Sequence, residues 1–507
     1  MLKKQVIILL SVVFLSVSSR LTAQIDYQAL NQYIAQARVN FGVTGLAVGI
    51  VQNGDIVFQN GYGLEDIENE NNKVTTYSTF AIASLSKAFT ATALSVLVDQ
   101  GKLSWSDKVT THLSYFKLND PIVTQLITVE DLLCHRSGLK TFDGDLLWYG
   151  SKYDAKEIIK RIAKRPLEAE FRTEFGYQNI MYIAAAQIIE KVTGITWQSY
   201  LQKYFFDPLG MTSSVTSIHA FKSNQKIAHP HISGIKQEIA DYSNGSGAVG
   251  IHTTVNDMTK WLNLLLFEGK VDGDSLFSNR SIRSTFEPRL PMKVSSFDEA
   301  LGIHFKAYAL GWKTFDYDGK KVMSHGGGLP GYISQVAIVP EEKLGIILLS
   351  NDMTSLTSAL LYKLLDEFLG KKGKKKDWAV EFAKYEIGGK EQDQLYSMEL
   401  LDKKMKKPVH SLPMQNYVGF YEDSMYGTAE VRIVKNNLQL TLLPSNQIFR
   451  SELEPWDKDL FKVSFNDDML PDGLVTFNVN QKKVESFNIN LPNPDFHFYK
   501  LKFVKYN

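Results

Sequence analysis

The sequence has a single cysteine, Cys134, among its 507 residues. One cysteine cannot form an internal disulfide, so the hydrophobic core must stabilise the fold. Cysteine and histidine can form a nucleophile and base pair, and His135 follows directly. Adjacent residues on a helix point in different directions, however, and Cys134 continues the apolar pair Leu132-Leu133. We therefore interpret Cys134 as a small core residue.

The sequence also lacks an excess of charge of either sign. It contains 56 lysine and arginine residues against 55 aspartate and glutamate residues, for a formal net charge of +1. This balance excludes a global electrostatic attraction to nucleic acid, and we expect no nucleic-acid partner. The hydrophobic content of 44% and the charged content of 22% are typical of a folded globular chain, long enough here for two domains.

Only one long apolar run is present, from Val6 to Val17, and it is shorter than the roughly 20 residues that span a bilayer. Lys3-Lys4 precede it and Leu21-Thr22-Ala23 follow it. This pattern predicts a signal peptide over residues 1–23, with an uncleaved membrane anchor as the alternative. We therefore expect a periplasmic or secreted bacterial protein with no stable membrane span after cleavage.

The spacing of apolar residues predicts an α/β architecture for the first part of the chain. Asn53-Gly54, between two β-type apolar runs, is the strongest short signal for a hairpin. Strand patterns return only after about Leu290, so the first and last segments are expected to meet in one layer, with the active cleft between this sheet and a helical insertion. The expected elements are helices at 27–38, 84–97 and 181–194, a hairpin at 45–63, strands at 309–315, 334–340 and 344–351, and a last helix that ends at Gly370.

Two further regions follow this first part. Residues 371–410 contain two lysine runs, and we interpret them as a solvated, lysine-rich linker. Residues 411–507 contain short strands separated by turn residues, a spacing that predicts a small antiparallel barrel or sandwich. We expect the aromatic residues of this region, including Tyr417, Tyr421 and Phe496, to form its core.

Ser84 and Lys87 are separated by two residues at the start of a predicted helix. Residues three apart share a helix face, so the lysine amine can reach the serine hydroxyl. By itself the pair equally fits a helix-capping serine with an exposed lysine. A serine nucleophile also needs proton-transfer groups, polar substrate contacts and an oxyanion hole. Tyr177 and Asn179, in a loop before a helix, and His325 followed by three glycines offer these parts.

Together these motifs resemble the serine β-lactamase and penicillin-binding-protein superfamily, in particular its class C β-lactamase-related branch of D-aminopeptidases, DD-carboxypeptidases and esterases. Tyr177-Gln178-Asn179 matches the Tyr-x-Asn element, and His325-Gly326-Gly327 falls on the Lys-Thr-Gly element. The similarity runs in order from about Ile25 to Gly370. It implies an antiparallel sheet flanked by helices, with a helical subdomain, in a catalytic domain at 24–370. The region at 411–507 resembles the lipocalin-like module that often follows such hydrolases.

The resemblance also implies a role for each site residue. Ser84 would attack a carbonyl and become acylated, Lys87 would help to deprotonate it, and Tyr177 would act as general base and then general acid. The backbone N–H groups of Ser84 and Gly328 would form the oxyanion hole. The implied substrate-binding residues are Asn179, His325 and Gly327.

Either Tyr177 or Lys87 can be the base that deprotonates Ser84. Tyrosine titrates near pH 10, so a tyrosine base at pH 7 requires roughly 4 kcal/mol of stabilisation of its phenolate. A nearby Lys87 ammonium in a low-dielectric cleft can supply much of it. Alternatively, burial makes Lys87 neutral and Tyr177 only relays the proton. The two groups titrate together, so both readings stay open.

These residues predict an exported serine hydrolase that cleaves amide or ester bonds of small peptides, D-amino-acid or cell-wall-derived compounds, or esters through an acyl-enzyme, with no metal or organic cofactor. A penicillin-recognising or cell-wall-binding sensor with little turnover is one alternative, and a true class C-like β-lactamase is another. His325 disfavours the latter, because a fixed positive charge and a hydroxyl are both lost from the Lys-Thr-Gly element.

Two expectations concern regions outside these motifs. His229 and His231 are spaced like metal ligands on a strand, but no third ligand is apparent, and we expect them at the cleft rim. The C-terminal barrel is expected to cap the cleft, to bind a ligand or to form a homo-oligomer.

Overall fold

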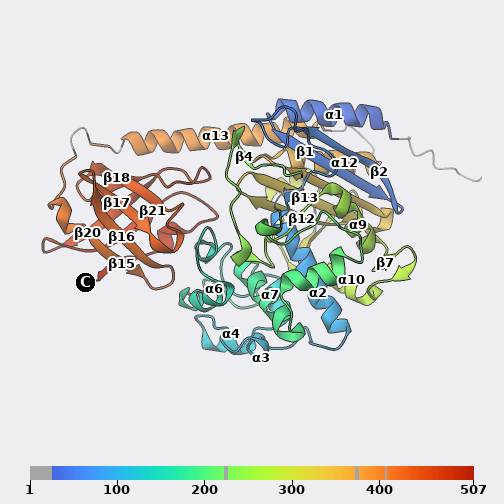
Figure 1. Ribbon diagram of the computed structural model, residues 1–507, viewed down its shortest axis with the longest axis horizontal. Helices are drawn as coiled ribbons and strands as arrows, with labels where there is room; N and C mark the ends of the chain where they lie inside the picture. The colour runs from blue at the N-terminus through green and yellow to red at the C-terminus, as the bar shows by residue number, and fades with distance from the viewer. Residues whose placement is uncertain (1–24, 222–225, 371–375, 403, 406–407, 507) are drawn as a thin grey trace, which may run out of the picture.

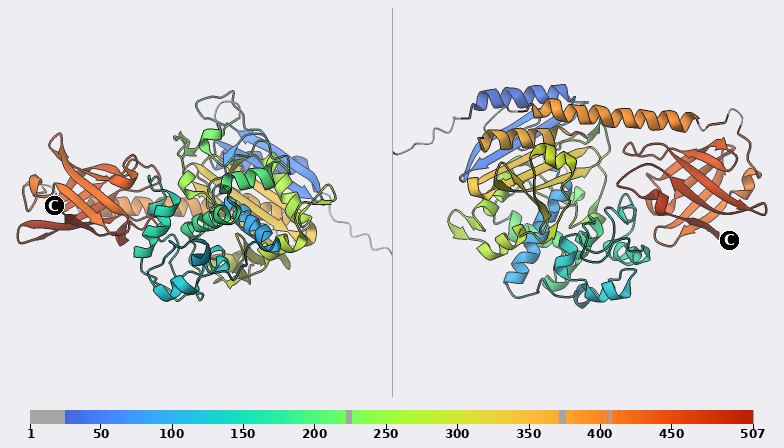
Figure 2. Two further views of the ribbon diagram at one scale, coloured as in Figure 1. Left: turned by 60° about the horizontal axis from the view of Figure 1, so that its bottom comes forward. Right: turned by 180° about the vertical axis from the view of Figure 1, so that it is seen from behind.

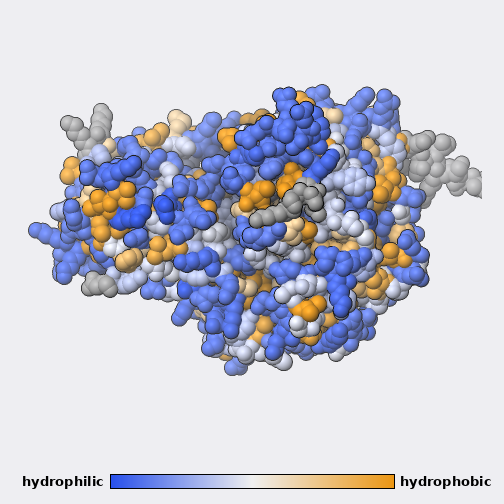
Figure 3. Space-filling model, viewed as in Figure 1, coloured by the Kyte–Doolittle hydropathy of each residue, from blue (hydrophilic) through white to orange (hydrophobic). Residues whose placement is uncertain are grey.

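The computed structural model describes residues 25–221, 226–370, 376–402, 404–405 and 408–506 (Figure 1). The predicted signal peptide lies outside the described residues. Within the described ranges, every helix is too short or too polar to cross a membrane. On the face seen in Figure 3, hydrophilic residues cover most of the surface and apolar residues gather in small separate patches.

An antiparallel sheet of eight strands lies at the centre of the first part of the chain. Its N-terminal hairpin turns at Asn53 and Gly54, both at positive φ, and β1 pairs with β14 from the end of this part. The first and last segments therefore share one layer, and the predicted fold class is confirmed. In order across the sheet the strands are β2 (Asp55–Gly63), β1 (Gly45–Gln52), β14 (Leu344–Ser350), β13 (Tyr332–Val339), β12 (Lys320–Leu329), β11 (Lys313–Tyr317), β10 (Lys306–Tyr308) and β9 (Leu290–Pro291).

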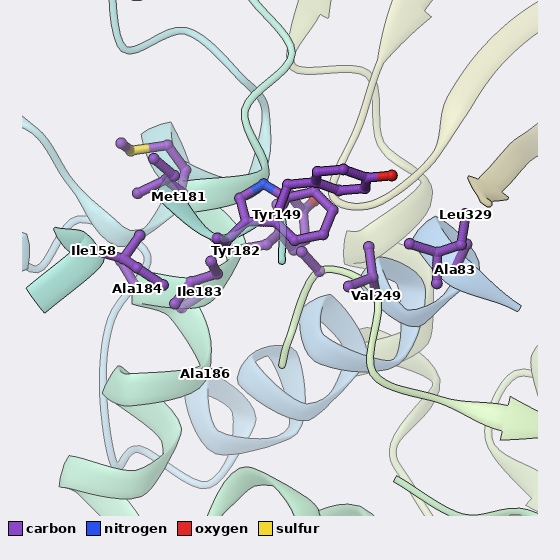
Figure 4. Packing of buried hydrophobic residues seen from close by; sticks show 14 of the residues in the cluster. Ala83, Tyr149, Ile158, Met181, Tyr182, Ile183, Ala184, Ala186, Val249 and Leu329 are labelled. Carbon is purple, nitrogen blue, oxygen red and sulfur yellow. The ribbon is translucent and has the colours of Figure 1, made fainter. Parts of the chain in front are cut away.

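Helices cover both faces of this sheet (Figures 1 and 2). One face packs against α1 (Tyr27–Asn40), α12 (Leu356–Phe368) and the start of α13 (Trp378–Asp402). The other packs against the helical subdomain, part of whose apolar core is shown in Figure 4. The helices between β2 and β10 are α2 (Ser86–Asp99), α3 (Val109–His112), α4 (Pro121–Leu126), α5 (Val129–Leu133), α6 (Ala155–Arg161), α7 (Asn179–Thr193), α8 (Trp197–Leu201), α9 (Val255–Leu266), α10 (Asn279–Phe286) and α11 (Ser296–Leu301).

The strand predicted over 309–315 is wrong in its bounds. The Ala309 N–H donates to the Trp312 carbonyl oxygen at 2.8 Å, and Gly311 has a φ of +79°, so this stretch is a tight turn between β10 and β11. The apolar residues of the turn are buried like those of a strand, which explains why their pattern is misleading.

The segment predicted as a solvated linker over 371–410 contains a helix of 25 residues, α13. Its first turn is part of the core, because Trp378 and Phe382 are buried against α12. The Trp378 indole N–H donates to Asp366 at 2.7 Å. At 1.5 Å per residue the helix extends about 37 Å, and Figure 1 shows it running from the sheet to the C-terminal domain. The lysine composition concealed this structured connection.

The C-terminal domain is a closed antiparallel barrel of eight strands. Tyr417 and Tyr421 lie in its interior as predicted, with ring contacts to Phe477 and Phe487. In β18, Pro455 lies at a break in register that obscures the alternation of apolar and polar residues. The strands are β15 (Gly419–Asp423), β16 (Gly427–Val434), β17 (Asn437–Leu442), β18 (Arg450–Asp457), β19 (Leu460–Val463), β20 (Gly473–Asn480), β21 (Lys483–Asn490) and β22 (Phe503–Tyr506).

The barrel docks on the loop between α5 and α6. Phe496 was expected inside the barrel, but its ring packs on Tyr149 with centroids 4.2 Å apart. The buried carboxylate of Asp143 accepts hydrogen bonds from Lys500 at 2.8 Å and from Arg165 at 3.1 Å. Apolar stacking and a buried ion cluster thus fix one edge of the barrel against the helical subdomain. Oligomer formation through the barrel stays a prediction.

Replacing Trp378 by alanine tests whether α13 belongs to the core of the first part. Trp378→Ala should lower the free energy of unfolding by roughly 3–5 kcal/mol, because it empties a large buried site and removes the hydrogen bond to Asp366. Val380, on the same helix, is 51% exposed, and Val380→Ala should change stability by less than about 0.5 kcal/mol. Urea denaturation of both variants measures the difference. Equal stabilities would show that α13 is only a tether.

Candidate active site

Ser84 lies in a single 3₁₀ turn, Ala83–Leu85, directly before α2. The turn is held by hydrogen bonds from the Ile82 N–H to the Ile251 carbonyl and from the Leu85 N–H back to the Ile82 carbonyl. Ala83 has a φ of 47°, a left-handed conformation that costs a non-glycine residue roughly 1–2 kcal/mol. Strained backbone of this kind is found where the surrounding structure needs one particular geometry, here directly before the candidate nucleophile.

Lys87 is fully buried one turn further along α2. Its Nζ lies 2.9 Å from Ser84 Oγ, 2.7 Å from Asn179 Oδ1 and 3.1 Å from the Ala248 carbonyl oxygen. Burial lowers the pKa of Lys87 to about 7, although the charge of Asp145 opposes this shift. A neutral amine has two N–H donors for the amide and carbonyl oxygens and one lone pair that can accept the Ser84 proton.

Tyr177 lies beside this pair, with its ring centre 4.9 Å from Lys87 Nζ. Burial raises the pKa of Tyr177; a hydrogen bond to Ser84 lowers it, and the charge of Asp145 raises it further. The phenol therefore stays protonated at neutral pH. The pKa of Tyr177 thus moves away from the value near 7 that suits a base at neutral pH. The pKa of Lys87 moves toward that value.

Asn179 is the first residue of α7 and joins Lys87 to Asp145. Its oxygen accepts from Lys87, and its Nδ2 donates to Asp145 Oδ2 at 2.6 Å. Burial raises the pKa of Asp145 to about 7, although the Trp148 indole, the Asn179 amide and the Lys87 charge all lower it. Both polar groups of Asn179 are thus occupied within the protein, and its contact with substrate stays a prediction.

His325 lies on β12 and is buried at the pocket wall. Its Nδ1 donates to the Gly326 carbonyl oxygen at 2.7 Å, so Nε2 accepts from the Tyr308 hydroxyl at 2.9 Å. Burial, together with the charges of Lys87 and Lys313, lowers the pKa of His325 well below its usual value. The ring is therefore neutral, with both nitrogens engaged inside the protein. Substrate binding by His325 stays a prediction.

Of the three glycines after His325, one packs against the Ser84 turn and two line the pocket. Gly327, expected to contact substrate, packs against the Ser84 turn, where a Cβ would lie 3.0 Å from the Ser84 nitrogen and even closer to Ser334 Oγ. Gly326 and Gly328 line the pocket with Ser84. This arrangement brings β12 alongside the Ser84 turn, as an oxyanion hole from the N–H groups of Ser84 and Gly328 requires.

These residues surround a cavity of about 490 Å³, within the range of small-molecule sites. Its wall includes Met469, Asp495 and Phe496 of the barrel, so the barrel forms part of the pocket. His229 and His231 are not among its lining residues. His231 is buried elsewhere, where its ring bonds the Asn351 carbonyl oxygen and the Ile67 N–H.

The sequence motifs did not identify Asp145 and Lys313, which both lie in the pocket wall. Asp145 directly precedes the apolar run in "DLLWYG", and Lys313 follows the buried Trp312 in "ALGWKTF". In each case the signal is a charged residue at the end of an apolar stretch, which places the charge against the core. Such residues are buried only when paired or functional.

Comparison with known proteins identifies the family of this chain. Residues 30–367 match the β-lactamase family model, and residues 403–505 match a domain of unknown function, DUF3471. The chain therefore belongs to the β-lactamase family.

Individual relatives include hydrolases and penicillin-binding proteins. The unguisins hydrolase ungD of Aspergillus violaceofuscus is 26% identical, over 77% of this chain and 73% of that protein. The putative penicillin-binding protein PbpX of Bacillus subtilis is 32% identical, over 51% of this chain and 62% of that protein. An octameric penicillin-binding protein homologue from Pyrococcus abyssi shares the fold, with a TM-score of 0.59 and 20% identity over 95% of this chain and 100% of that one.

Replacing Gly327 by alanine tests the close approach of β12 to the Ser84 turn. Gly327→Ala should lower kcat by roughly 10²- to 10³-fold, the effect of losing one oxyanion-hole donor, because its Cβ displaces the Ser84 nitrogen. In the matched variant Gly328→Ala, the Cβ meets only Ile333 Cδ1, at 3.5 Å, so a much smaller loss is expected. Ester hydrolysis by the two purified variants provides the comparison. A larger loss in Gly328→Ala would contradict the packing argument.

The pH dependence of kcat/KM tests the protonation state of Lys87. With a neutral ester, kcat/KM should rise with pH through an inflection near the Lys87 pKa of about 7, because only the neutral amine accepts the Ser84 proton. Asp145→Asn should move the inflection to lower pH, since the Asp145 charge raises the pKa of Lys87. An inflection only above about pH 9 would contradict this expectation, because Lys87 would then still be an ammonium in the resting protein at neutral pH.

Proposed function

We propose that this protein is an exported serine hydrolase that cleaves amide or ester bonds of small substrates through an acyl-enzyme. The observation that carries the proposal is the 2.9 Å contact between Ser84 Oγ and the buried amine of Lys87, at the wall of a substrate-sized cavity. Small peptides, including D-amino-acid or cell-wall-derived ones, and esters are the proposed substrates. Two relatives support this class by their names, a hydrolase of unguisins and a putative penicillin-binding protein.

In the acylation step, Ser84 Oγ attacks the substrate carbonyl carbon while its proton passes to the lone pair of Lys87 Nζ. The carbonyl π electrons move to the oxygen, where the N–H groups of Ser84 and Gly328 stabilise the negative charge. Tyr177 then gives its phenolic proton to the leaving group as the bond to the carbonyl carbon breaks. Lys87 returns the proton it holds to the tyrosine oxygen, so the protons balance.

In the deacylation step, water attacks the Ser84 ester and loses a proton to the same pair of groups. The carbonyl oxygen again occupies the oxyanion hole, and Ser84 Oγ leaves with a proton from Lys87 or Tyr177. The acid product and free enzyme result. Asn179 and Asp145 remain in place throughout and hold the amine against Ser84.

Labelling with a fluorophosphonate tests the proposal. We expect a single covalent adduct on Ser84 by mass spectrometry, and turnover of p-nitrophenyl esters that falls by roughly 10³-fold or more in Ser84→Ala. Ser86→Ala is the matched control, because Ser86 lies two residues away, is buried and points to the Ile251 N–H instead. If Ser84 remains unlabelled and esters remain intact, the site belongs to a binding protein and the proposal is wrong.

A further inference from the structure

His135 is a buried histidine beside the active site that takes no part in the proposed mechanism. It lies in the loop after α5, and its backbone has a φ of 60°. Apart from glycine, this left-handed region is adopted most readily by asparagine, aspartate and histidine. The next residue, Arg136, is anchored by ion pairs with Asp131 and Glu130. The surrounding structure thus fixes His135 in one strained conformation, as is typical near functional sites.

His135 binds the backbone on both sides of Tyr177. Its carbonyl oxygen accepts a hydrogen bond from the Gly176 N–H at 2.9 Å, and its ring nitrogen Nδ1 accepts one from the Gln178 N–H at 3.0 Å. Because the hydroxyl lies at the far end of the tyrosine side chain, a small tilt of the backbone at Tyr177 would move it by a larger distance. Two hydrogen bonds to a single residue therefore restrict where this hydroxyl can lie.

The imidazole of His135 also packs directly on the phenol ring of Tyr177. The two centroids are 4.4 Å apart, whereas the ring of His325 lies 6.1 Å from the same phenol. The imidazole is itself packed against Tyr308 and Tyr182, with centroids 4.7 Å and 5.3 Å away. In a close-packed interior such a ring cannot move without disturbing its neighbours. The phenol therefore lies against a fixed support.

His135 can accept the hydrogen bond from the Gln178 N–H only as a neutral imidazole. An imidazolium has two N–H donors and no acceptor, so protonation would break this bond. Burial, with the charge of Lys87 next in effect, lowers the pKa of His135 well below its usual value. The ring is thus uncharged at neutral pH, with its proton on Nε2, which has no hydrogen-bond acceptor among the described residues. The hydrogen bonding of the ring therefore serves the segment that carries Tyr177.

We propose that His135 is a positioning residue that holds the Tyr177 hydroxyl where it can transfer a proton to the leaving group. The inference rests on the proposed acyl-enzyme function, in which Tyr177 protonates the leaving group as its bond to the carbonyl carbon breaks. His135 is not among the residues that line the cavity, so it acts through Tyr177 rather than on substrate. A displacement of about 1 Å in a reacting group can lower a rate by about 10²-fold, so this support matters for catalysis.

Two esters with the same acyl group provide the test. p-Nitrophenyl butyrate releases a weakly basic phenolate that leaves without a proton, whereas the ethoxide of ethyl butyrate needs a proton to leave. His135→Phe keeps a ring beside Tyr177 but leaves the Gln178 N–H without its acceptor. Its kcat/KM for the ethyl ester should fall roughly 10- to 100-fold, part of what a general acid contributes, while the p-nitrophenyl ester should change by less than about 3-fold.

The conservative variant His135→Asn should rescue the ethyl ester. Its side-chain oxygen can take the place of Nδ1, and asparagine tolerates a positive φ, so kcat/KM should stay within about 5-fold of wild type. In His135→Gln the amide oxygen lies one bond further out, and this variant should behave like His135→Phe. The asparagine and glutamine variants carry the same test if His135→Phe fails to fold.

His231→Phe is the matched control. It also removes a buried imidazole acceptor, in this case that of the Ile67 N–H at 3.2 Å, but outside the pocket. It should leave the ratio of the two ester rates unchanged.

A double-mutant cycle with Tyr177→Phe shows whether His135 acts through the tyrosine. In the Tyr177→Phe background, His135→Phe should cause no further loss with ethyl butyrate, because the group that it positions is gone. Additive losses, or equal effects of His135→Phe on both esters, would overturn the inference while leaving the hydrolase intact. Ester turnover that persists in Ser84→Ala would instead overturn the proposed function.

Discussion

The structure of the site depends on the burial of one amine. An isolated ammonium in an apolar interior is so costly that a buried lysine usually loses its proton. Lys87 is completely buried, yet it lies among three oxygen atoms, from the 3₁₀ turn before α2, from α7 and from the loop at Ala248. These partners suit a neutral amine that accepts a proton from Ser84 and then shares the resulting charge with Asp145 through Asn179. Each neighbouring element is constrained by this requirement, from the strained turn at Ala83 to the start of α7.

The barrel and the long helix that leads to it belong to the same arrangement. The loop that carries Asp145 also carries Asp143 and Tyr149, which contact Lys500 and Phe496 of the barrel. The barrel therefore packs on the outer side of a loop whose Asp145 accepts a hydrogen bond from the Asn179 amide. Barrel residues also line the cavity, so the C-terminal domain forms part of its wall. A domain that looks appended in sequence is thus part of the pocket in three dimensions.

The sequence predicted most of the fold because its signals are local. Asn53-Gly54 defines a hairpin by backbone geometry, and Gly194, with a φ of +74°, ends α7 where predicted. Ser84, Lys87 and Tyr177 were found as motifs, and the structure brings them together. Asp145 and Lys313 were not found, because their importance comes from contacts across the cavity rather than from spacing along the chain. The helical nature of α13 was hidden for a similar reason: its stability comes from packing of its first turn on α12, which no local pattern reports.

The burial of Lys87 leads to one central expectation, that its pKa lies near 7 and that a large fraction of the amine is therefore uncharged near neutral pH. The most direct measurement is a pH titration by NMR of protein labelled with ¹³C at lysine Cε, with the Lys87 signal assigned by its absence from Lys87→Met. We expect a titration midpoint near 7, about three units below that of an exposed lysine. A midpoint near 10, unchanged from the surface lysines, would contradict it and return the role of base to Tyr177.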